Sequence, residues 1–308
     1  MKTILSFILI CFTILPSFSQ STVKELKITT LSTMVSNWGV GEWGYAALVE
    51  VDGHKILFDT GNRPGTVIQN AKDQKIDLSD VSDVILSHFH YDHTGGALSL
   101  IRNGLGSDTR FHAGKGILIP RQGFLTNTMD SIKTVLEKNG NEFIIHDQPA
   151  EIVPGVWVTG PVDRVTTEKN YPANVELITE EGIMEDDVPE DQSLVINTSK
   201  GLVIISGCGH SGIINTIRYT RSRIADRNVH AMIGGFHLVM ASDEELSWTA
   251  DELKRNQVEY LNGAHCTGLN ALFELREKMG LDRNTAVIGT VGDQFDLEKG
   301  ITPGLIAR

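Results

Sequence analysis

The sequence is poor in cysteine and in positive charge. Three cysteines among 308 residues are too few for a disulfide-based scaffold, whereas ten histidines indicate imidazole chemistry. Asp and Glu outnumber Lys and Arg by 39 to 27, so the formal net charge is −12. This balance argues against nucleic acid or an anionic membrane surface as the main partner. A hydrophobic content of 41% suffices for a sizeable core and argues against disorder.

Several common sequence signals are also missing. No low-complexity linker or fixed-period repeat divides the chain, which favours a single domain over residues 20–308. No Gly-x-Ser-x-Gly, Walker or dinucleotide-binding fingerprint is present, so nothing indicates a serine nucleophile or a nucleotide cofactor. Beyond the N-terminus there is no long apolar run, and we expect no stable membrane insertion. The sequence leaves the oligomeric state open.

The first residues have the three parts of a secretory signal. Lys2 precedes an uncharged apolar stretch over residues 4–15, and Pro16 ends it. Residues 17–19 then fit a small-x-small cleavage site. The pattern predicts a signal peptide over residues 1–19 and a periplasmic or secreted protein. An N-terminal anchor or a buried first helix is the alternative.

Hydrophobic patterning predicts two similar halves, each beginning with strands and continuing with strands and helices in alternation. Strands are expected over residues 26–33, 45–51, 55–59, 84–87, 194–197, 202–206, 229–233, 259–262 and 286–289. Helices are expected over residues 66–75, 126–139, 213–225, 243–256 and 269–279. Such halves pack sheet on sheet with helices on both outer faces. The acidic residues 176–191 between them are predicted to form a solvated surface loop, with a lid as the alternative.

The densest chemical signal follows directly after a short apolar strand. His88, His90, Asp92 and His93 form a His-x-His-x-Asp-His motif. In an extended segment alternate side chains share a face, so His88, His90 and Asp92 are expected to point the same way. The chain then turns, and His93 enters from a neighbouring direction. Imidazole and carboxylate suit a borderline ion such as Zn²⁺, and the pattern favours two ions close together. Surface histidines on a loop are the alternative.

Three further segments and one strand carry a family resemblance. They are Leu57-Phe58-Asp59-Thr60-Gly61, Gly207-Cys208-Gly209-His210-Ser211-Gly212, Gly234-Gly235-Phe236-His237-Leu238 and Ala264-His265-Cys266-Thr267-Gly268. With the histidine motif, they make the chain resemble the metallo-β-lactamase superfamily of metal-dependent hydrolases. Within it the chain is similar to the branch named after a dihydropteridine–ribofuranosylaminobenzene-phosphate synthase. The resemblance covers nearly the whole mature chain. It implies an α/β (α+β) fold, a four-layer αββα sandwich of two mixed β-sheets flanked by helices.

The resemblance also implies a ligand set for two divalent ions, Zn²⁺ first, with Mn²⁺ or Fe as alternatives. The expected metal ligands are His88, His90, Asp92, His93, His210 and His265. His265 matches the late histidine of the second metal, and His210 is the best candidate to complete the first. Cys208 stands about where the superfamily has a bridging Asp, so the chain departs from the usual pattern there. Cys208 and Cys266 remain after signal cleavage, and they pair, stay inert or lie near a metal.

Other residues have expected roles around these ligands. Asp92 orients the nucleophile while it binds metal. His237, also at a strand end, either exchanges a proton with the leaving group or positions substrate. Asp59 accepts a hydrogen bond from a ligating imidazole, or else caps its own turn. The segment 38–43 either forms a rim of the site or folds onto the core through its two Trp rings. His112 is a weaker candidate for a place near the site.

The reaction class follows from this ligand set. Two divalent ions lower the pKa of a shared water, and the resulting hydroxide attacks a carbonyl or phosphoryl centre. The sequence therefore predicts an exported metal-dependent hydrolase of a small-molecule ester, phosphoester, lactone or amide. A metal-binding but non-catalytic binding or sensing module is one alternative. A metallo-nuclease of the same superfamily is another, against which the acidic charge weighs.

Overall fold

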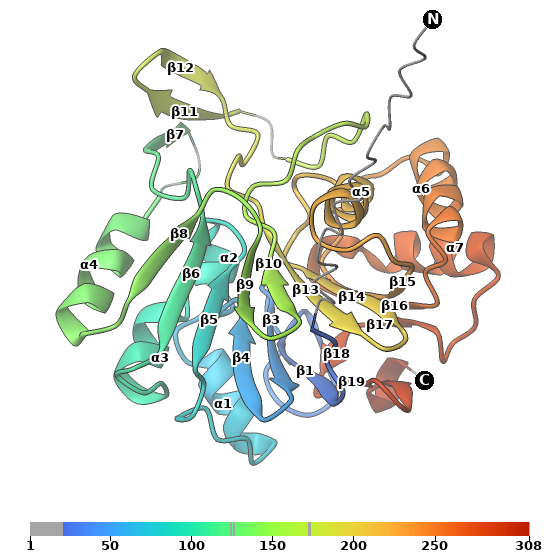
Figure 1. Ribbon diagram of the computed structural model, residues 1–308, viewed down its shortest axis with the longest axis horizontal. Coiled ribbons are helices and arrows are strands. Elements are labelled where there is room, and N and C mark those ends of the chain that lie inside the picture. The colour runs from blue at the N-terminus through green and yellow to red at the C-terminus, as the bar shows by residue number, and fades with distance from the viewer. Residues whose placement is uncertain (1–20, 124, 126, 172–173, 308) are drawn as a thin grey trace, which may run out of the picture.

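The computed structural model describes residues 21–123, 125, 127–171 and 174–307. The signal peptide predicted over residues 1–19 lies outside the described residues. Two large β-sheets pack face to face, and helices cover both outer faces (Figure 1). This arrangement confirms the four-layer αββα sandwich expected from the sequence.

The first sheet has eight strands in the order β20-β19-β1-β3-β4-β5-β6-β8. It is mixed, because β1, β3, β4 and β19 pair antiparallel whereas β4, β5, β6 and β8 run parallel. Its strands are β1 (Leu26–Ser32), β3 (Ala46–Val51), β4 (His54–Phe58), β5 (Asp83–Leu86), β6 (Arg110–Gly114), β8 (Phe143–His146), β19 (Gln294–Asp296) and β20 (Gly300–Thr302).

The second sheet has seven strands in the order β17-β16-β15-β14-β13-β10-β9. Strands β9, β10, β13 and β14 pair antiparallel with their neighbours in that series, and β14, β15, β16 and β17 run parallel. The strands are β9 (Ala150–Val153), β10 (Val156–Val158), β13 (Ser193–Thr198), β14 (Gly201–Ser206), β15 (Val229–Gly234), β16 (Tyr260–Gly263) and β17 (Ala286–Ile288).

Helices on the two outer faces bury separate apolar clusters. Leu48 and Leu57 of the first sheet share one cluster with Val67, Leu100 and Ile132 from three helices. On the other side, helices α5, α6 and α7 cover the second sheet through a cluster of their own. The helices are α1 (Thr66–Asp73), α2 (Tyr91–Thr94), α3 (Ala97–Asn103), α4 (Met129–Asn139), α5 (Ile213–Arg223), α6 (Asp243–Arg255) and α7 (Leu269–Met279), with short 3₁₀ turns η1 (His265–Thr267) and η2 (Leu305–Ala307).

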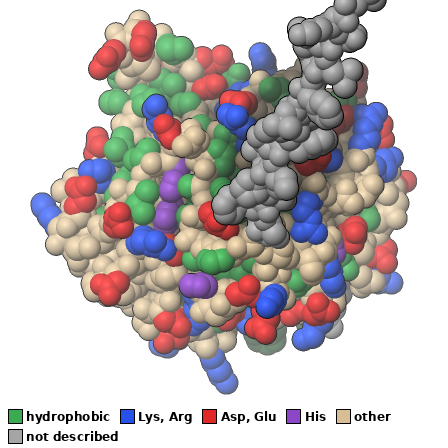
Figure 2. Space-filling view, viewed as in Figure 1, with side chains coloured by type: hydrophobic (Ala, Val, Ile, Leu, Met, Phe, Trp, Pro, Cys, Tyr) green, Lys and Arg blue, Asp and Glu red, His purple; other side chains and the backbone are tan. Residues whose placement is uncertain are grey.

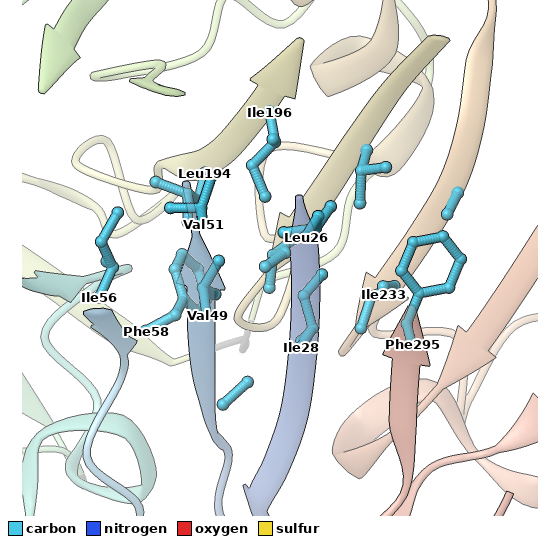
Figure 3. Packing of buried hydrophobic residues seen from close by; sticks show 14 of the residues in the cluster. Leu26, Ile28, Val49, Val51, Ile56, Phe58, Leu194, Ile196, Ile233 and Phe295 are labelled. Carbon is cyan, nitrogen blue, oxygen red and sulfur yellow. The ribbon is translucent and has the colours of Figure 1, made fainter. Parts of the chain in front are cut away.

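The central core lies between the sheets, and strand alternation explains how it forms. Along β3, Val49 and Val51 face the second sheet, whereas Leu48 faces the helices. Figure 3 shows side chains of β1 and β3 meeting Leu194 and Ile196 of β13 across this interface. Both faces of these strands are buried, which is why the sequence has near-continuous apolar runs there. Each fully buried side chain of this kind contributes about 1.5–3 kcal/mol.

Local signals place several element ends. The hairpin between β3 and β4 turns at Asp52 and Gly53, whose φ angles of 43° and 83° are those of the tight turn that an Asp-Gly pair favours. Helix α6 begins after Ser242, whose hydroxyl accepts the Glu245 N–H while the Glu245 carboxylate accepts the Ser242 N–H, a capping box. Ser242 is thus the N-cap of α6.

Two parts of the fold differ from expectation. The chain end returns to the first sheet, because β19 pairs with β1, so the sheets do not correspond strictly to two sequential halves. The acidic residues 176–191 do not form a surface loop. Strands β11 (Val175–Thr179) and β12 (Gly182–Glu185) form a hairpin there and join β7 (Arg121–Gly123) in a small sheet that projects from the body (Figure 1).

A further two-stranded pair joins β2 (Val35–Ser36) to β18 (Thr290–Val291), and it ties the N-terminal part of the chain to the C-terminal part. Among the described residues, no helix combines the length and apolar content that a membrane crossing requires.

Candidate metal centre

Five strands deliver candidate site residues at the same edge of the sandwich. Asp59 follows β4, and the histidine motif follows β5, the parallel neighbour of β4. In the second sheet, His210 follows β14, His237 follows β15 and His265 follows β16. Carboxyl ends of adjacent parallel strands meet at one sheet edge, so residues far apart in the chain converge there.

The motif after β5 is only partly extended. His90 has φ −57° and ψ 142°, and helix α2 begins at the next residue. Asp92 therefore lies on a helical turn and does not continue the extended face of His88 and His90, as the sequence analysis expected. The turn forms because the His90 carbonyl accepts the N–H groups of His93 and Thr94. As a result Asp92 and His93 point to a different part of the site from His88 and His90.

Three imidazole nitrogens form the first group. His88 Nε2 lies 2.9 Å from His90 Nδ1, and His210 Nε2 lies 3.2 Å from each of them. Nitrogen ligands held at about 2.0–2.1 Å by a tetrahedral ion would be about 3.4 Å apart, so these nitrogens fit such an ion. Burial, reinforced by the neighbouring imidazoles, lowers the pKa of His88 and His210 well below the usual range and that of His90 to about 3. The rings are thus neutral, with lone pairs free for a cation.

A second group lies beside the first. Its ligand atoms come from Asp92, His93, Cys208 and His265, all within 4.8 Å of one another. Asp92 Oδ2 lies 3.1 Å from His265 Nε2 and 3.8 Å from His93 Nε2. Burial raises the pKa of the Asp92 carboxyl, but His93 and His265 outweigh it and hold that pKa well below its ordinary value. The structure thus brings all six sequence-predicted ligands together and adds Cys208.

Asp59 contacts the His93 imidazole through the ring nitrogen that does not face the second group. Its Oδ2 is 2.7 Å from His93 Nδ1, which confirms the predicted contact with an imidazole of the motif. The same carboxylate accepts hydrogen bonds from the Ser87 N–H and hydroxyl at 2.7 and 2.8 Å. Burial lowers the pKa of His93, but the Asp59 and Asp92 carboxylates outweigh it and raise that pKa to about 9. Asp59 therefore fixes the ring so that Nε2 faces the second group.

The loop after β14 comes unusually close to the first sheet. A Cβ on Gly207 would lie 2.1 Å from Ser87 Oγ, so only glycine allows this approach. Beyond it, the Ser211 N–H donates to Asp191, and Arg164 donates to the His210 carbonyl at 2.6 Å. These contacts hold Cys208 and His210 against the motif after β5.

Backbone strain gathers at the same place. Asp59, His237 and His265 have φ angles of 57°, 49° and 47°, in the left-handed region that side chains other than glycine rarely adopt. Such conformations persist where the surrounding structure enforces them, and they are common at functional sites. Here each one turns a side chain at a strand end toward the ligand groups.

A buried ionic network supports the motif and was missed by the sequence analysis. The Arg121 side chain donates to Asp186 at 3.0 Å and pairs with Glu190 at 2.5 Å, and its guanidinium lies 3.9 Å from the centre of the Phe89 ring. Glu190 also accepts the Phe89 N–H. Asp186, Glu190 and Asp191 belong to the acidic segment expected to be solvated, yet all are buried. Composition alone suggested that this segment lies at the surface, because the cationic partner of Asp186 and Glu190, Arg121, lies more than 60 residues upstream.

His237 lies between the first group and a cavity. Its ring centre is 4.7 Å from that of His210, and burial lowers its pKa. The cavity measures about 320 Å³, and its lining includes His237, Leu238, Met240, Trp248 and Lys169. The His237 side chain therefore lies where it can contact both a substrate group at the first ligand group and a molecule bound in the cavity.

The segment 38–43 forms a rim and does not fold onto the core. Trp38 is 81% exposed and Trp43 is 48% exposed. The Trp43 ring lies 4.8 Å from the His265 ring in an edge-on contact. One indole therefore borders the second group directly.

The remaining histidines lie outside the two ligand groups. His112 hydrogen-bonds to Asp83 and His146, at 2.8 and 2.9 Å. It therefore lies away from the site, although its sequence position had made it a candidate for a place there. His230 pairs with Glu259. Cys208 and Cys266 are both free and buried, so they do not form a disulfide. Burial and the adjacent Cys266 raise the pKa of the Cys208 thiol.

Comparisons with known proteins agree with this geometry. The model of the metallo-β-lactamase superfamily matches residues 44–154. The chain is 29% identical over 265 residues to the 7,8-dihydropterin-6-methyl-4-(β-D-ribofuranosyl)-aminobenzene-5′-phosphate synthase of Methanocaldococcus jannaschii, covering 81% of this chain and 90% of that protein. It is 32% identical over 260 residues to an uncharacterised protein of the same organism, covering 81% and 91%.

Among solved structures, the chain is similar to Tm1679, a metal-dependent hydrolase of the β-lactamase superfamily. The two share 26% identity with a TM-score of 0.74, over 88% of this chain and 98% of that one. A sandwich with histidine-rich strand ends defines a class of metal-dependent enzymes. The chain belongs to the metallo-β-lactamase superfamily.

Proposed function

We propose that the protein is an exported hydrolase that uses two divalent ions, Zn²⁺ first, to cleave an ester, phosphoester, lactone or amide bond in a small molecule. The observation that carries this proposal is the convergence of His88, His90 and His210 nitrogens within 3.2 Å, beside a second group of ligand atoms. Divalent ions bound there would supply Lewis acidity and lower the pKa of a coordinated water to near neutrality.

The residues of this chain would set up that chemistry. The first ion would be held by His88, His90 and His210, and the second by Asp92, His93 and His265. The second Asp92 oxygen would accept a hydrogen bond from the attacking water and orient it. Asp59 keeps the His93 ring fixed, so the ligand geometry exists before substrate arrives.

The cavity beside His237 suits the part of the substrate that does not react. Leu238, Met240 and Trp248 give it an apolar wall, and its charged lining residues are Lys169, Glu168 and Glu245. His237, between this cavity and the first ligand group, is positioned to exchange a proton with the departing group. A substrate with an apolar or flat portion fits this apolar wall.

The net charge of the chain and the distribution of its basic side chains favour a small-molecule substrate over nucleic acid. On the face shown in Figure 2, Lys and Arg side chains lie scattered among Asp and Glu without forming a continuous basic stripe. With a formal net charge of −12, the chain lacks the electrostatic attraction that phosphate backbones require.

A panel of chromogenic phosphodiesters, carboxylic esters, lactones and amides tests the proposal. We expect turnover that a chelator abolishes and Zn²⁺ restores. The double variant His88→Ala, His90→Ala should be inactive, whereas His54→Ala, at an exposed position on β4, should match the wild type. Turnover that survives the double substitution would end the proposal.

A second candidate comes from the similarity to a synthase across 81% of the chain. That relative's name describes a product in which a pterin is joined through a methyl group to an aminobenzene. In such a reaction an organic nucleophile would take the place of water, and the pterin-methyl carbon that it attacks would lose a leaving group. The residues that hold the two ions would then keep the ions beside the negative charge that develops on that leaving group. Turnover in heavy-oxygen-labelled water separates the two: label in the product supports hydrolysis, and unlabelled joined product supports the synthase reaction.

A further inference from the structure

One side chain belongs to both ligand groups. Cys208 Sγ lies within 4.8 Å of the ligand atoms of Asp92, His93 and His265, and also within 4.8 Å of those of His88 and His210. It is 3.0 Å from His93 Nε2, and the residue is only 2% exposed. The sulfur therefore occupies the space between the two groups.

We propose that Cys208 binds as a thiolate that contacts both metal ions. This inference rests on the proposed function, since it requires that both groups bind metal. The thiol would lose its proton to solvent as the ions bind. The Cys208 sulfur then takes the place where the superfamily that this chain resembles has a bridging Asp.

No carboxylate competes for this position among the described residues. Asp92 is the one carboxylate in either group, and it faces His265. Asp59 is occupied by Ser87 and His93, and Asp191 accepts the Ser211 N–H and belongs to neither group. The loop after β14 thus offers sulfur, and not oxygen, between the groups.

A bridging thiolate has a consequence for metal choice. Thiolate together with imidazole selects Zn²⁺, Co²⁺ and Fe²⁺, whereas Mg²⁺ and Mn²⁺ favour carboxylate and water. We therefore infer that this centre takes the softer divalent ions and discriminates against Mn²⁺. A carboxylate at position 208 should shift that preference toward Mn²⁺.

The chain supplies a matched control in Cys266. This second buried thiol lies near the first, with its sulfur 3.8 Å from the Cys208 carbonyl, yet it belongs to neither ligand group. Removing Cys266 alters packing at the same place without removing a proposed ligand. A metal-binding signal that depends on Cys208 should therefore be retained in the Cys266→Ser variant.

Titration of the metal-free protein with Co²⁺ gives a readout independent of activity. Sulfur bound to Co²⁺ produces a charge-transfer absorption in the near ultraviolet, which we expect in the wild type and in Cys266→Ser. Cys208→Ser and Cys208→Ala should lack it and bind the second ion more than roughly 100-fold more weakly, since even a hydrogen-bond partner of a ligating histidine is worth 10–100-fold. Cys208→Asp should bind two ions again but lack the charge-transfer absorption. Binding of two ions by this variant would show that a substitution at position 208 leaves the site folded.

X-ray absorption of the zinc-loaded wild type needs no variant. It should contain a zinc–sulfur distance of about 2.3 Å. Two bound Co²⁺ ions with no charge-transfer absorption, or an absorption lost in Cys266→Ser and kept in Cys208→Ser, would overturn the thiolate while leaving a binuclear centre intact. Failure of the wild type to bind any Co²⁺ would instead overturn the proposed function, and this inference with it.

Discussion

Replacing Asp59 by Asn tests how far the site depends on the group behind its ligands. The substitution keeps the size of the side chain but removes its charge. Asp59 is fully buried, lies 2.7 Å from His93 Nδ1 and also accepts two hydrogen bonds from Ser87. An amide NH₂ would face one of these donors, so at least one buried hydrogen bond to the carboxylate is lost.

The expected magnitude follows from these contacts. A hydrogen-bond partner of a metal-ligating histidine contributes about 10–100-fold in metal affinity, or about 1.4–2.8 kcal/mol. We expect Asp59→Asn to weaken binding of one ion by that factor. The ion bound by His88, His90 and His210 should be retained, because those rings do not contact Asp59. Metal-free Asp59→Asn should also lose about 1–3 kcal/mol of unfolding free energy.

The His93–Asp59 pair also gives the metal-free protein a pH signature. Burial lowers the pKa of His93, but Asp59 and Asp92 raise it to about 9 against an ordinary value of 6.5. A raised histidine pKa stabilises the folded state fully below 6.5, and this contribution is lost as pH rises through 9. In Asp59→Asn the loss of stability over that alkaline range should shrink.

Competition with a chromogenic chelator measures the affinity, and urea unfolding at several pH values measures the stability. Asp83→Asn is the matched control, because Asp83 is another buried acid that bonds an imidazole, that of His112, at 2.8 Å. It should lower stability without changing metal affinity. Equal metal affinities in wild type and Asp59→Asn, or an equal loss in both variants, would refute the role assigned to Asp59.

Three further predictions concern residues around the ligands. Burial raises the pKa of Glu190 to about 7 despite its Arg121 partner, so its contribution to stability is complete below 4.5 and lost as pH rises through 7. Metal-free Glu190→Gln should therefore lose less unfolding free energy than the wild type as pH rises across that range in urea unfolding, and parallel pH profiles would contradict this. His237→Gln should lower kcat by at least roughly 100-fold with both ions retained by elemental analysis, and loss of an ion would instead make His237 a ligand. Trp248→Ala should raise KM by roughly 10-fold at nearly constant kcat, and an unchanged KM would remove the cavity from substrate binding.

The fold could be predicted wherever its signals are local. Near-continuous apolar runs identify the central strands, and the Asp52-Gly53 turn and the Ser242 cap lie within a few residues of the elements they define. Strands β8 and β9 were not predicted, because each has four residues and is only partly buried. Strand β10 was not predicted either, because its three residues are too few to show a period of two, although Val156 and Val158 are buried. The return of β19 to β1 joins opposite ends of the chain, and no local pattern specifies it.

The candidate site divides in the same way. His88, His90, Asp92 and His93 lie in one short window, so their spacing alone indicates a metal motif. The convergence on Cys208 brings together residues more than 100 positions apart, as its contact with His93 shows. Sequence reasoning located this cysteine where a bridging residue belongs, but its distance from both ligand groups emerges only from the packing of the two sheets.

The burial of Asp186, Glu190 and Asp191 at the end of the acidic segment was unpredictable for a related reason. In the sequence, Asp186 and Glu190 resemble part of a solvated run of charges. In the folded protein, β7 places Arg121 beside both of them. An isolated charge run usually belongs to the surface, and only a distant partner of opposite sign makes burial tolerable. Here that partner also packs against Phe89, in the middle of the metal motif.

Metal content of the purified protein, measured by elemental mass spectrometry, tests the central claim most directly. His210→Ala and His265→Ala should be measured beside the wild type, with His54→Ala as the exposed control. The account predicts close to two ions per chain in the wild type and the control, and close to one in each of the other variants. A wild type with one ion or none, or two ions retained in both His210→Ala and His265→Ala, would contradict a binuclear centre built from these two ligand groups.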